Sequence, residues 1–206
     1  PLAFVLARRQ FPLKAALTVL VELPIVMPPV VAGLALLLAF GRQGILGGPL
    51  SDLGIQITFT PIAVVLAQVF VASPFYIRAA QIQFRSIPME IIEAAEIDGA
   101  TGYRSMRKVF LPLSWRALLA GFLLSWARAL GEFGATILFA GNLQGSTQTM
   151  PLLVYAALEQ NIDAAITTGL ILIGSAALSM GVVQFLVGRS EFAEDSEPNL
   201  QKTGIA

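Results

Sequence analysis

The sequence predicts an all-helical protein that crosses a membrane several times. Of its 206 residues, 56% are hydrophobic and only 13% are charged, whereas soluble domains carry about 25% charged residues. The mean hydropathy is +0.76, and the apolar residues gather into stretches close to the roughly 20 residues that a membrane-spanning helix needs. A lipid bilayer is therefore the expected surrounding of most of the chain.

Four apolar stretches are predicted to form complete spans, and a shorter apolar segment at residues 1–7 precedes them. This segment has the composition of a helix end and does not resemble a secretory signal peptide. Residues 11–23 are predicted to lie along the membrane interface. Pro74 lies inside the second stretch, where a proline kinks a helix. The four predicted spans are residues 24–40, 61–77, 117–140 and 164–187.

The basic residues predict which loops face the cytoplasm, because Lys and Arg in short loops mark that side. Loops 41–60 and 141–163 contain one basic residue between them, Arg42, and are therefore predicted to face outward. A transmembrane domain is predicted over residues 1–189, followed by a disordered, acidic cytoplasmic tail at residues 190–206. The residues that mark the cytoplasmic side are Arg8, Arg9, Lys14, Arg78, Arg85, Arg104, Arg107, Lys108, Arg116, Arg189 and Lys202.

The longest predicted cytoplasmic loop, residues 78–116, contains signals for a short helix of its own. Ser86 and Pro88 are typical of a helix start, and Gly99 is typical of a helix stop. One face of this helix has small side chains at its centre, which would let another surface approach closely. An ordinary solvated helical loop is the alternative interpretation. The residues of this face are Ile91, Ala94, Ala95 and Asp98.

The spacing within this loop resembles the signature of permease subunits of ATP-binding-cassette (ABC) importers. That signature is Glu-Ala-Ala, three residues, Gly, nine residues, an aliphatic residue, one residue and Leu-Pro. Here valine stands at the aliphatic position where isoleucine is more usual. In that family the short helix docks on the ATPase subunit, so the resemblance implies an ATPase-coupling role for the matching residues. They are Glu93, Ala94, Ala95, Gly99, Val109, Leu111 and Pro112.

Residues 23–47 and 128–159 resemble the molybdate-type branch of these permeases, and the sulfate permeases share a similar pattern of Gly-Glu-Phe-Gly-Ala and Gly-Asn. The resemblance covers nearly the whole chain. It implies a type I ABC importer permease fold in the cell inner membrane, with four complete spans here and one or two further spans in relatives. Molybdate or tungstate is the implied substrate, and sulfate or thiosulfate is the alternative.

The same resemblance implies several partners for the chain. They are a second copy of the permease, two cytoplasmic ABC ATPase subunits and an extracytoplasmic oxyanion-binding protein. No nucleic-acid partner is expected. ATP would act on the partner subunit, because Lys14, Lys108 and Lys202 do not follow the glycine that a nucleotide-binding loop requires.

The chain has no Cys and no His, which excludes thiol nucleophiles, histidine triads and the common zinc sites. The chain is therefore predicted to be a transporter subunit that is not an enzyme and binds no cofactor or metal. An intramembrane enzyme would have to use Ser125, Ser175 or Ser179, none of which has an evident base. A proton-coupled transporter would depend on Glu132 and would leave the loop signature unexplained.

Arg128 and Glu132 are predicted to lie near mid-membrane on the third span, one helical turn apart. A central charge costs about 2.5–3.5 kcal/mol on insertion scales, so such residues usually pair or face a cavity. A structural ion pair and a role in lining an anion path both stay open. Gly131, Gly134 and Gly141 would let a second helix approach this region closely.

Overall fold

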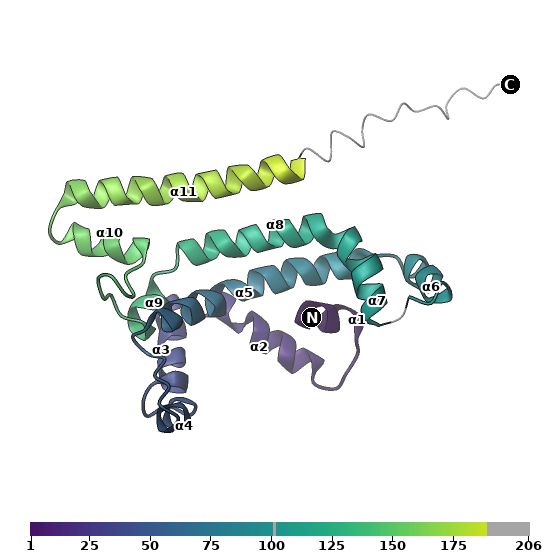
Figure 1. The fold of residues 1–206 in the computed structure, drawn as a ribbon, viewed down its shortest axis with the longest axis horizontal. Helices are drawn as coiled ribbons and strands as arrows, with labels where there is room; N and C mark the ends of the chain where they lie inside the picture. The colour runs from purple at the N-terminus through teal and green to yellow at the C-terminus, as the bar shows by residue number, and fades with distance from the viewer. Residues whose placement is uncertain (101, 189–206) are drawn as a thin grey trace.

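The computed structural model describes residues 1–100 and 102–188, and every regular element in this part of the chain is a helix (Figure 1). The predicted tail at residues 190–206 lies outside the described residues. Helices α5 (Pro61–Ser86) and α8 (Leu111–Leu130) run side by side at the centre. Helix α11 (Ile162–Gly188) packs along α8, and α1 (Leu2–Arg8) packs against α5.

Three helices of the described part are long and apolar enough to cross a membrane. They are Pro61–Ser86, the continuous helix Tyr103–Leu130, and Ile162–Val182 within α11. The fourth predicted span, residues 164–187, matches α11 to within two residues at its start. The expectation of four complete spans is wrong by one, since the remaining apolar helix, Pro29–Phe40, is shorter.

The first predicted span is interrupted by adjacent prolines. Helix α2 (Lys14–Val26) ends before Met27, whose backbone is extended with φ −70° and ψ 135°. Helix α3 (Pro29–Phe40) then begins. Pro28 and Pro29 lack N–H donors, and a proline also disfavours helical geometry in the residue before it. The 12 residues of α3 cover about 18 Å, which is less than the roughly 30 Å of a bilayer core.

The second predicted span begins as expected but continues well beyond residue 77. The Thr60 hydroxyl accepts a hydrogen bond from the Ala63 N–H at 3.4 Å and so caps the start of α5. The helix includes Pro74 and reaches Ser86. Beside the proline, the Ser125 hydroxyl of α8 donates to the Ala72 carbonyl at 2.7 Å. A neighbouring helix thus binds the backbone close to Pro74, although the carbonyl that loses its helical donor to the proline is that of Phe70, four residues back.

The third predicted span, residues 117–140, is wrong at both ends. The helix starts earlier as α7 (Tyr103–Ser105), continues as the π-helical turn η1 (Met106–Phe110) and passes directly into α8. Pro112 does not interrupt it, because Pro112 lies in the first turn of α8 and the preceding turn is widened. The Leu111 N–H donates to the Met106 carbonyl, five residues back.

Beyond α8 the chain breaks and forms a separate short helix, α9 (Gly134–Phe139), which packs against α3 and α5. Two short helices lie in the predicted outward loops, α4 (Gly47–Asp52) and α10 (Met150–Leu158). The buried cluster around α9 consists of Ala32, Leu36, Ala63, Ala67, Val71, Ala135, Phe139 and Ala140.

Gly33 lets α3 and α9 come into backbone contact. A Cβ added at this position would lie 2.7 Å from the Ala135 carbonyl oxygen and 2.8 Å from the Ala135 Cα. These are backbone atoms of a buried helix, so they cannot move aside as a flexible side chain would. The absence of a side chain at Gly33 is therefore required for this packing.

We expect the Gly33→Ala variant to lose about 1–3 kcal/mol of unfolding free energy, because the added methyl group overpacks the α3–α9 contact. The matched control is Gly169→Ala in α11, where an added Cβ meets nothing within 4 Å. That change should be neutral or stabilising by up to about 1 kcal/mol, since alanine favours a helix more than glycine does. Denaturant unfolding in detergent micelles measures both, and equal stability of the two variants would contradict the packing argument.

Candidate functional site

The predicted short helix is present as α6 (Met89–Ile97), in the connection between α5 and α7. This connection covers residues 87–102 and lies within the predicted cytoplasmic loop of residues 78–116, whose bounds stay a prediction. Pro88 stands at the N-cap, with no side-chain cap hydrogen bond. The Ser86 hydroxyl donates to the Gln83 carbonyl of α5 instead, so its expected role as cap of the new helix is wrong.

Gly99 ends α6 through two backbone hydrogen bonds. Its own N–H donates to the Glu96 carbonyl at 2.9 Å, and the Ala100 N–H donates to the Ala95 carbonyl at 2.8 Å. This is the Schellman arrangement, which requires a left-handed residue just after the helix. Gly99 has φ +79° and supplies that conformation. The helix stop predicted at Gly99 is confirmed.

Helix α6 leaves most of its surface uncovered. Only Ile92 is buried among its residues, and Ala95 is half-buried. Glu93 and Ala94 of the signature are exposed. The four acidic residues of this segment are exposed as well: Glu90, Glu93, Glu96 and Asp98. The face with small side chains is therefore available for contact with another protein.

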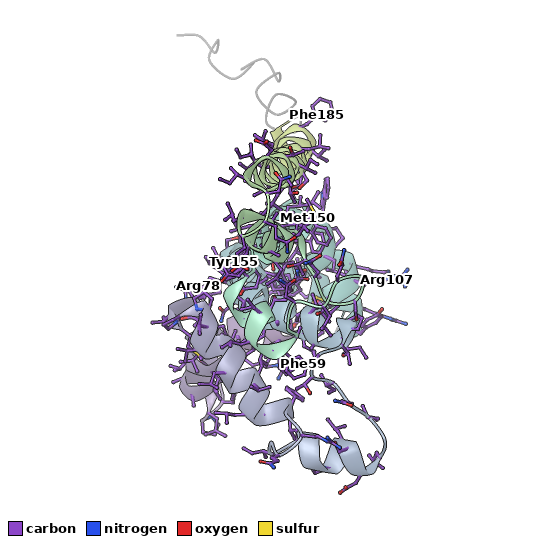
Figure 2. All side chains as sticks on the ribbon, turned by 90° about the vertical axis from the view of Figure 1, so that its left-hand side faces the viewer. Phe59, Arg78, Arg107, Met150, Tyr155 and Phe185 are labelled. Carbon is purple, nitrogen blue, oxygen red and sulfur yellow. The ribbon has the colours of Figure 1, made fainter. Side chains whose placement is uncertain are left out.

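The second half of the signature lies on the helix that rises from the connection. Val109 is half-buried in η1, whereas Leu111 and Pro112 are exposed at the start of α8. The basic side chains of this segment, Arg104, Arg107 and Lys108, are exposed. In Figure 2 the Arg107 side chain lies at the edge of the molecule and points away from the helices. The structure thus places the first half of the signature in and just after α6, within the connection, and the second half on the helix that follows the connection.

Arg128 and Glu132 form an ion pair at the end of α8. Arg128 Nη1 lies 2.8 Å from Glu132 Oε2, and the Glu132 side chain is only 1% exposed, compared with 30% for Arg128. Glu132 does not lie within a continuous span, because α8 ends at Leu130. It occupies the break between α8 and α9.

The Glu132 carboxylate also caps the start of α9. Its Oε1 accepts a hydrogen bond from the buried Ala135 N–H at 2.8 Å. One oxygen therefore satisfies a helix N–H group that has no partner within its own helix, and the other binds the guanidinium. Both oxygens of this buried carboxylate have partners, which a buried charge requires. Its role in lining a path stays a prediction.

The glycines near this break have different surroundings. A Cβ at Gly134 would lie 2.8 Å from Pro29 Cβ, whereas at Gly131 it would meet nothing within 4 Å. Gly141 has φ +74° and faces the Phe59 ring. Of the three, Gly134 is the one at which another helix of this chain, α3, approaches closely.

Sequence reasoning treated Arg8 and Arg78 only as markers of the cytoplasmic side. In the structure Arg78 forms an ion pair with Glu22 of α2. Arg8 reaches the start of the α6 connection and donates to the Ile87 carbonyl at 2.6 Å. Burial lowers the pKa of the Arg8 guanidinium, which stays charged all the same. The sequence did contain a signal for the Glu22–Arg78 pair, because an acidic and a basic residue stand at the edges of the first and second apolar stretches.

Comparison with known proteins identifies the family of this helical arrangement. The sequence model of the family described as "Binding-protein-dependent transport system inner membrane component" matches residues 1–191 of this chain. The chain belongs to this family. Its members named below are permease proteins of transport systems, which agrees with the resemblance drawn from the loop signature.

Three relatives of this permease family have similar sequences. The probable transport system permease protein NifC of Clostridium pasteurianum is 43% identical over 74% of this chain and 54% of its own length. The molybdenum transport system permease protein ModB of Mycobacterium tuberculosis is 43% identical over 86% of this chain and 67% of its own. The sulfate transport system permease protein CysW of Synechococcus elongatus is 39% identical over 90% of this chain and 65% of its own length. The chain thus spans about half to two thirds of these relatives.

A solved structure shares the fold of this permease. It is a bacterial alginate ABC transporter in complex with an alginate pentasaccharide-bound periplasmic protein. The match has a TM-score of 0.67 and covers 99% of this chain and 72% of that chain, at 18% sequence identity. At this identity the likeness shows a common fold.

We expect Arg128 and Glu132 to be coupled energetically. Arg128→Met and Glu132→Gln should each lower the unfolding free energy, and the double variant should lose about 1–3 kcal/mol less than the sum of the two. Glutamine keeps an acceptor for the Ala135 N–H, so the cycle isolates the charge pair from the cap. Unfolding in detergent micelles provides the measurement.

The control for this cycle is Arg42→Met, which removes an exposed charge in the loop after α3. Combined with Glu132→Gln it should give additive losses, because the two residues lie in separate regions. Additivity for Arg128 and Glu132 as well would show that the contact between them does not contribute to stability.

Proposed function

We propose that this chain is the membrane permease subunit of an ABC importer for molybdate or tungstate, with the type I importer fold. The observation that carries this proposal is the 43% identity to a molybdenum transport permease over 86% of the chain. The exposed α6 and its signature residues support the coupling to an ATPase. Sulfate is the alternative substrate, because a sulfate permease is 39% identical over 90% of the chain.

In the proposed mechanism α6 is the contact with a cytoplasmic ATPase subunit. Its exposed Glu93 and Ala94 and half-buried Ala95 form a surface of small and acidic side chains that a groove on a partner could accept. Val109, Leu111 and Pro112 connect this contact with α8. Movement of the ATPase would then pass through α6 into the membrane helices. ATP is hydrolysed on that partner, and this chain holds no nucleotide.

The proposed assembly contains two copies of this chain, two ATPase subunits and an extracytoplasmic binding protein, in the cell inner membrane. The connection carrying α6 faces the cytoplasm together with the C-terminal residues, in agreement with the distribution of Lys and Arg. The alginate transporter that shares the fold is in complex with a periplasmic protein. We therefore expect the substrate to be delivered by such a protein.

Selectivity for the anion is proposed to reside mainly in the binding protein. The predicted outward loops carry a single basic residue, Arg42. The charge of Arg128 is paired with the buried Glu132 carboxylate at 2.8 Å. A path with so little free positive charge would pass tetrahedral dianions without strong discrimination, so affinity has to come from the partner that delivers them.

The direct test is uptake by proteoliposomes that contain the permease, its ATPase and a molybdate-binding protein. We expect ATP-dependent uptake of molybdate and tungstate only when the binding protein is present. Uptake of sulfate but not of molybdate would show that sulfate, the alternative, is the substrate. Uptake that needs no binding protein would contradict the proposal as a whole.

We expect Gly99→Val to weaken the retention of the ATPase subunit on the membrane or to uncouple ATP hydrolysis from uptake. Gly99 has φ +79° and open space around it, so the cost of valine is backbone strain of about 1–2 kcal/mol or more rather than a collision. Relief of that strain would reshape the end of α6. Co-purification of the ATPase and molybdate uptake provide the measurements.

The matched control for this variant is Gly145→Val. Gly145 has φ +75°, and a Cβ added there also meets nothing within 4 Å. It lies in the loop before α10, on the predicted outer side, so the same strain should leave ATPase retention unchanged. Equal loss of ATPase in both variants would point to general misfolding, and normal coupling in Gly99→Val would exclude the proposed contact.

A further inference from the structure

The connection that carries α6 is held at its root by helix α1. Arg8, the last residue of α1, donates from Nη2 to the Ile87 carbonyl at 2.6 Å and from Nη1 to Met89 Sδ at 3.7 Å. These two acceptors lie on either side of Pro88, where α6 begins. One arginine therefore contacts both residues that flank the start of the helix.

Arg8 also reaches the helix that follows the connection. Its guanidinium carbon lies 5.4 Å from the centroid of the Phe110 ring, within the range of a cation–π contact. Phe110 ends η1 and is only 3% exposed. The same side chain thus links the segment entering α6 with the segment that leaves the connection and becomes α8.

A second arginine and three aromatic rings reinforce this junction. Arg85 of α5 donates from Nη2 to the Leu6 carbonyl of α1 at 3.4 Å, so a second arginine ties α1 to α5 just before the connection begins. Three phenylalanine rings meet edge to face. The centroid distances are 5.9 Å between Phe4 and Phe84, 4.8 Å between Phe4 and Phe110, and 6.0 Å between Phe84 and Phe110. Such pairs have a preferred geometry and resist sliding.

We propose that Arg8 is a positioning residue that holds the root of the α6 connection, so that a displacement of α6 moves α5 and α8 together. We call this junction of Arg8, Arg85, Phe4, Phe84 and Phe110 the root clamp. The inference rests on the proposed function insofar as α6 is taken to contact the ATPase. The contacts of the clamp themselves are independent of it.

The weak burial of α6 makes the root clamp necessary. Ile92 is the one side chain by which α6 itself enters the buried cluster, alongside Ile87, Phe84, Phe110, Ala3 and Ala80. A helix held by one side chain would pivot when pushed. With Arg8 joining its first residues to Phe110, a push on α6 reaches both central helices at the same point.

The test compares Arg8→Met with Arg9→Met in the reconstituted transporter. Arg9 is the adjacent basic residue, and its side chain is exposed, so the pair controls for loss of one positive charge near the membrane. We expect Arg8→Met to bind the ATPase normally but to import about tenfold fewer molybdate ions per ATP hydrolysed, the factor associated with one hydrogen bond from a charged group. Arg9→Met should keep the wild-type ratio.

A second measurement does not depend on transport. The chain has no Cys, so a single spin label can be placed by Ile97→Cys on α6, where the native side chain is 87% exposed. In the permease without its ATPase, we expect the label to become more mobile in the Arg8→Met background and to stay unchanged with Arg9→Met. Unchanged mobility together with an unchanged import ratio in Arg8→Met would overturn the inference.

Arg8→Lys keeps the experiment decisive if Arg8→Met fails to accumulate in membranes. Lysine preserves the charge but not the planar fork, so the import ratio should fall by a smaller factor, about threefold, with a modest gain in label mobility. Wild-type values of both in Arg8→Lys and no accumulation of Arg8→Met would reduce Arg8 to a folding residue and overturn the proposal. If the wild-type assembly imports no anion, the proposed function fails while the label still tests the clamp.

Discussion

The structure depends on a constraint that lipid imposes on the backbone: wherever a helix breaks, the freed N–H and C=O groups need partners from the protein itself. Glu132 provides such a partner at the break between α8 and α9. Beside Pro74 of α5, the Ser125 hydroxyl of α8 donates to the Ala72 carbonyl, which joins the two helices there but does not replace the bond to Phe70 that the proline removes. At Pro112 the helix solves the problem differently, by widening one turn so that Leu111 bonds five residues back. The break after α8 and the turn before Pro112 are therefore each accommodated by a specific side chain or by a widened turn.

This constraint gives the ion pair a structural origin. The Glu132 carboxylate is buried because the N-terminus of α9 needs an acceptor, and a buried carboxylate then needs a cation. Arg128, one turn back on α8, is the cation within reach. The pair therefore joins the end of one helix to the start of the next, and α9 in turn lies against α3 at Gly33. Any anion path along this surface would run beside a charge that the fold already uses.

The sequence predicted where apolar helices lie better than where they end. Hydropathy reports contact with lipid, and α5 continues from Ile77 to Ser86 through residues such as Arg78 and Arg85, which are polar but fully compatible with a helix. The opposite error occurred at Gly131, where apolar residues continue but the helix does not. The stop at Gly99 was predictable because it depends on one local conformation. The contacts of Arg8 were not, since they join segments about 80 positions apart.

The same difference between local and distant contacts bears on how α6 can work. Its helical signals are local, so the residues of the segment itself set where the helix ends and supply its glycine stop. Its attachment is not local, because a single buried side chain, Ile92, cannot fix the orientation of nine residues. The exposed side chains of α6 take no part in the contacts of the root clamp, so they can be substituted without removing those contacts. The exposed acidic and small residues of α6 and the aromatic junction at its root are thus separate sets of side chains, and in the proposed function the first would make the contact and the second would transmit its movement.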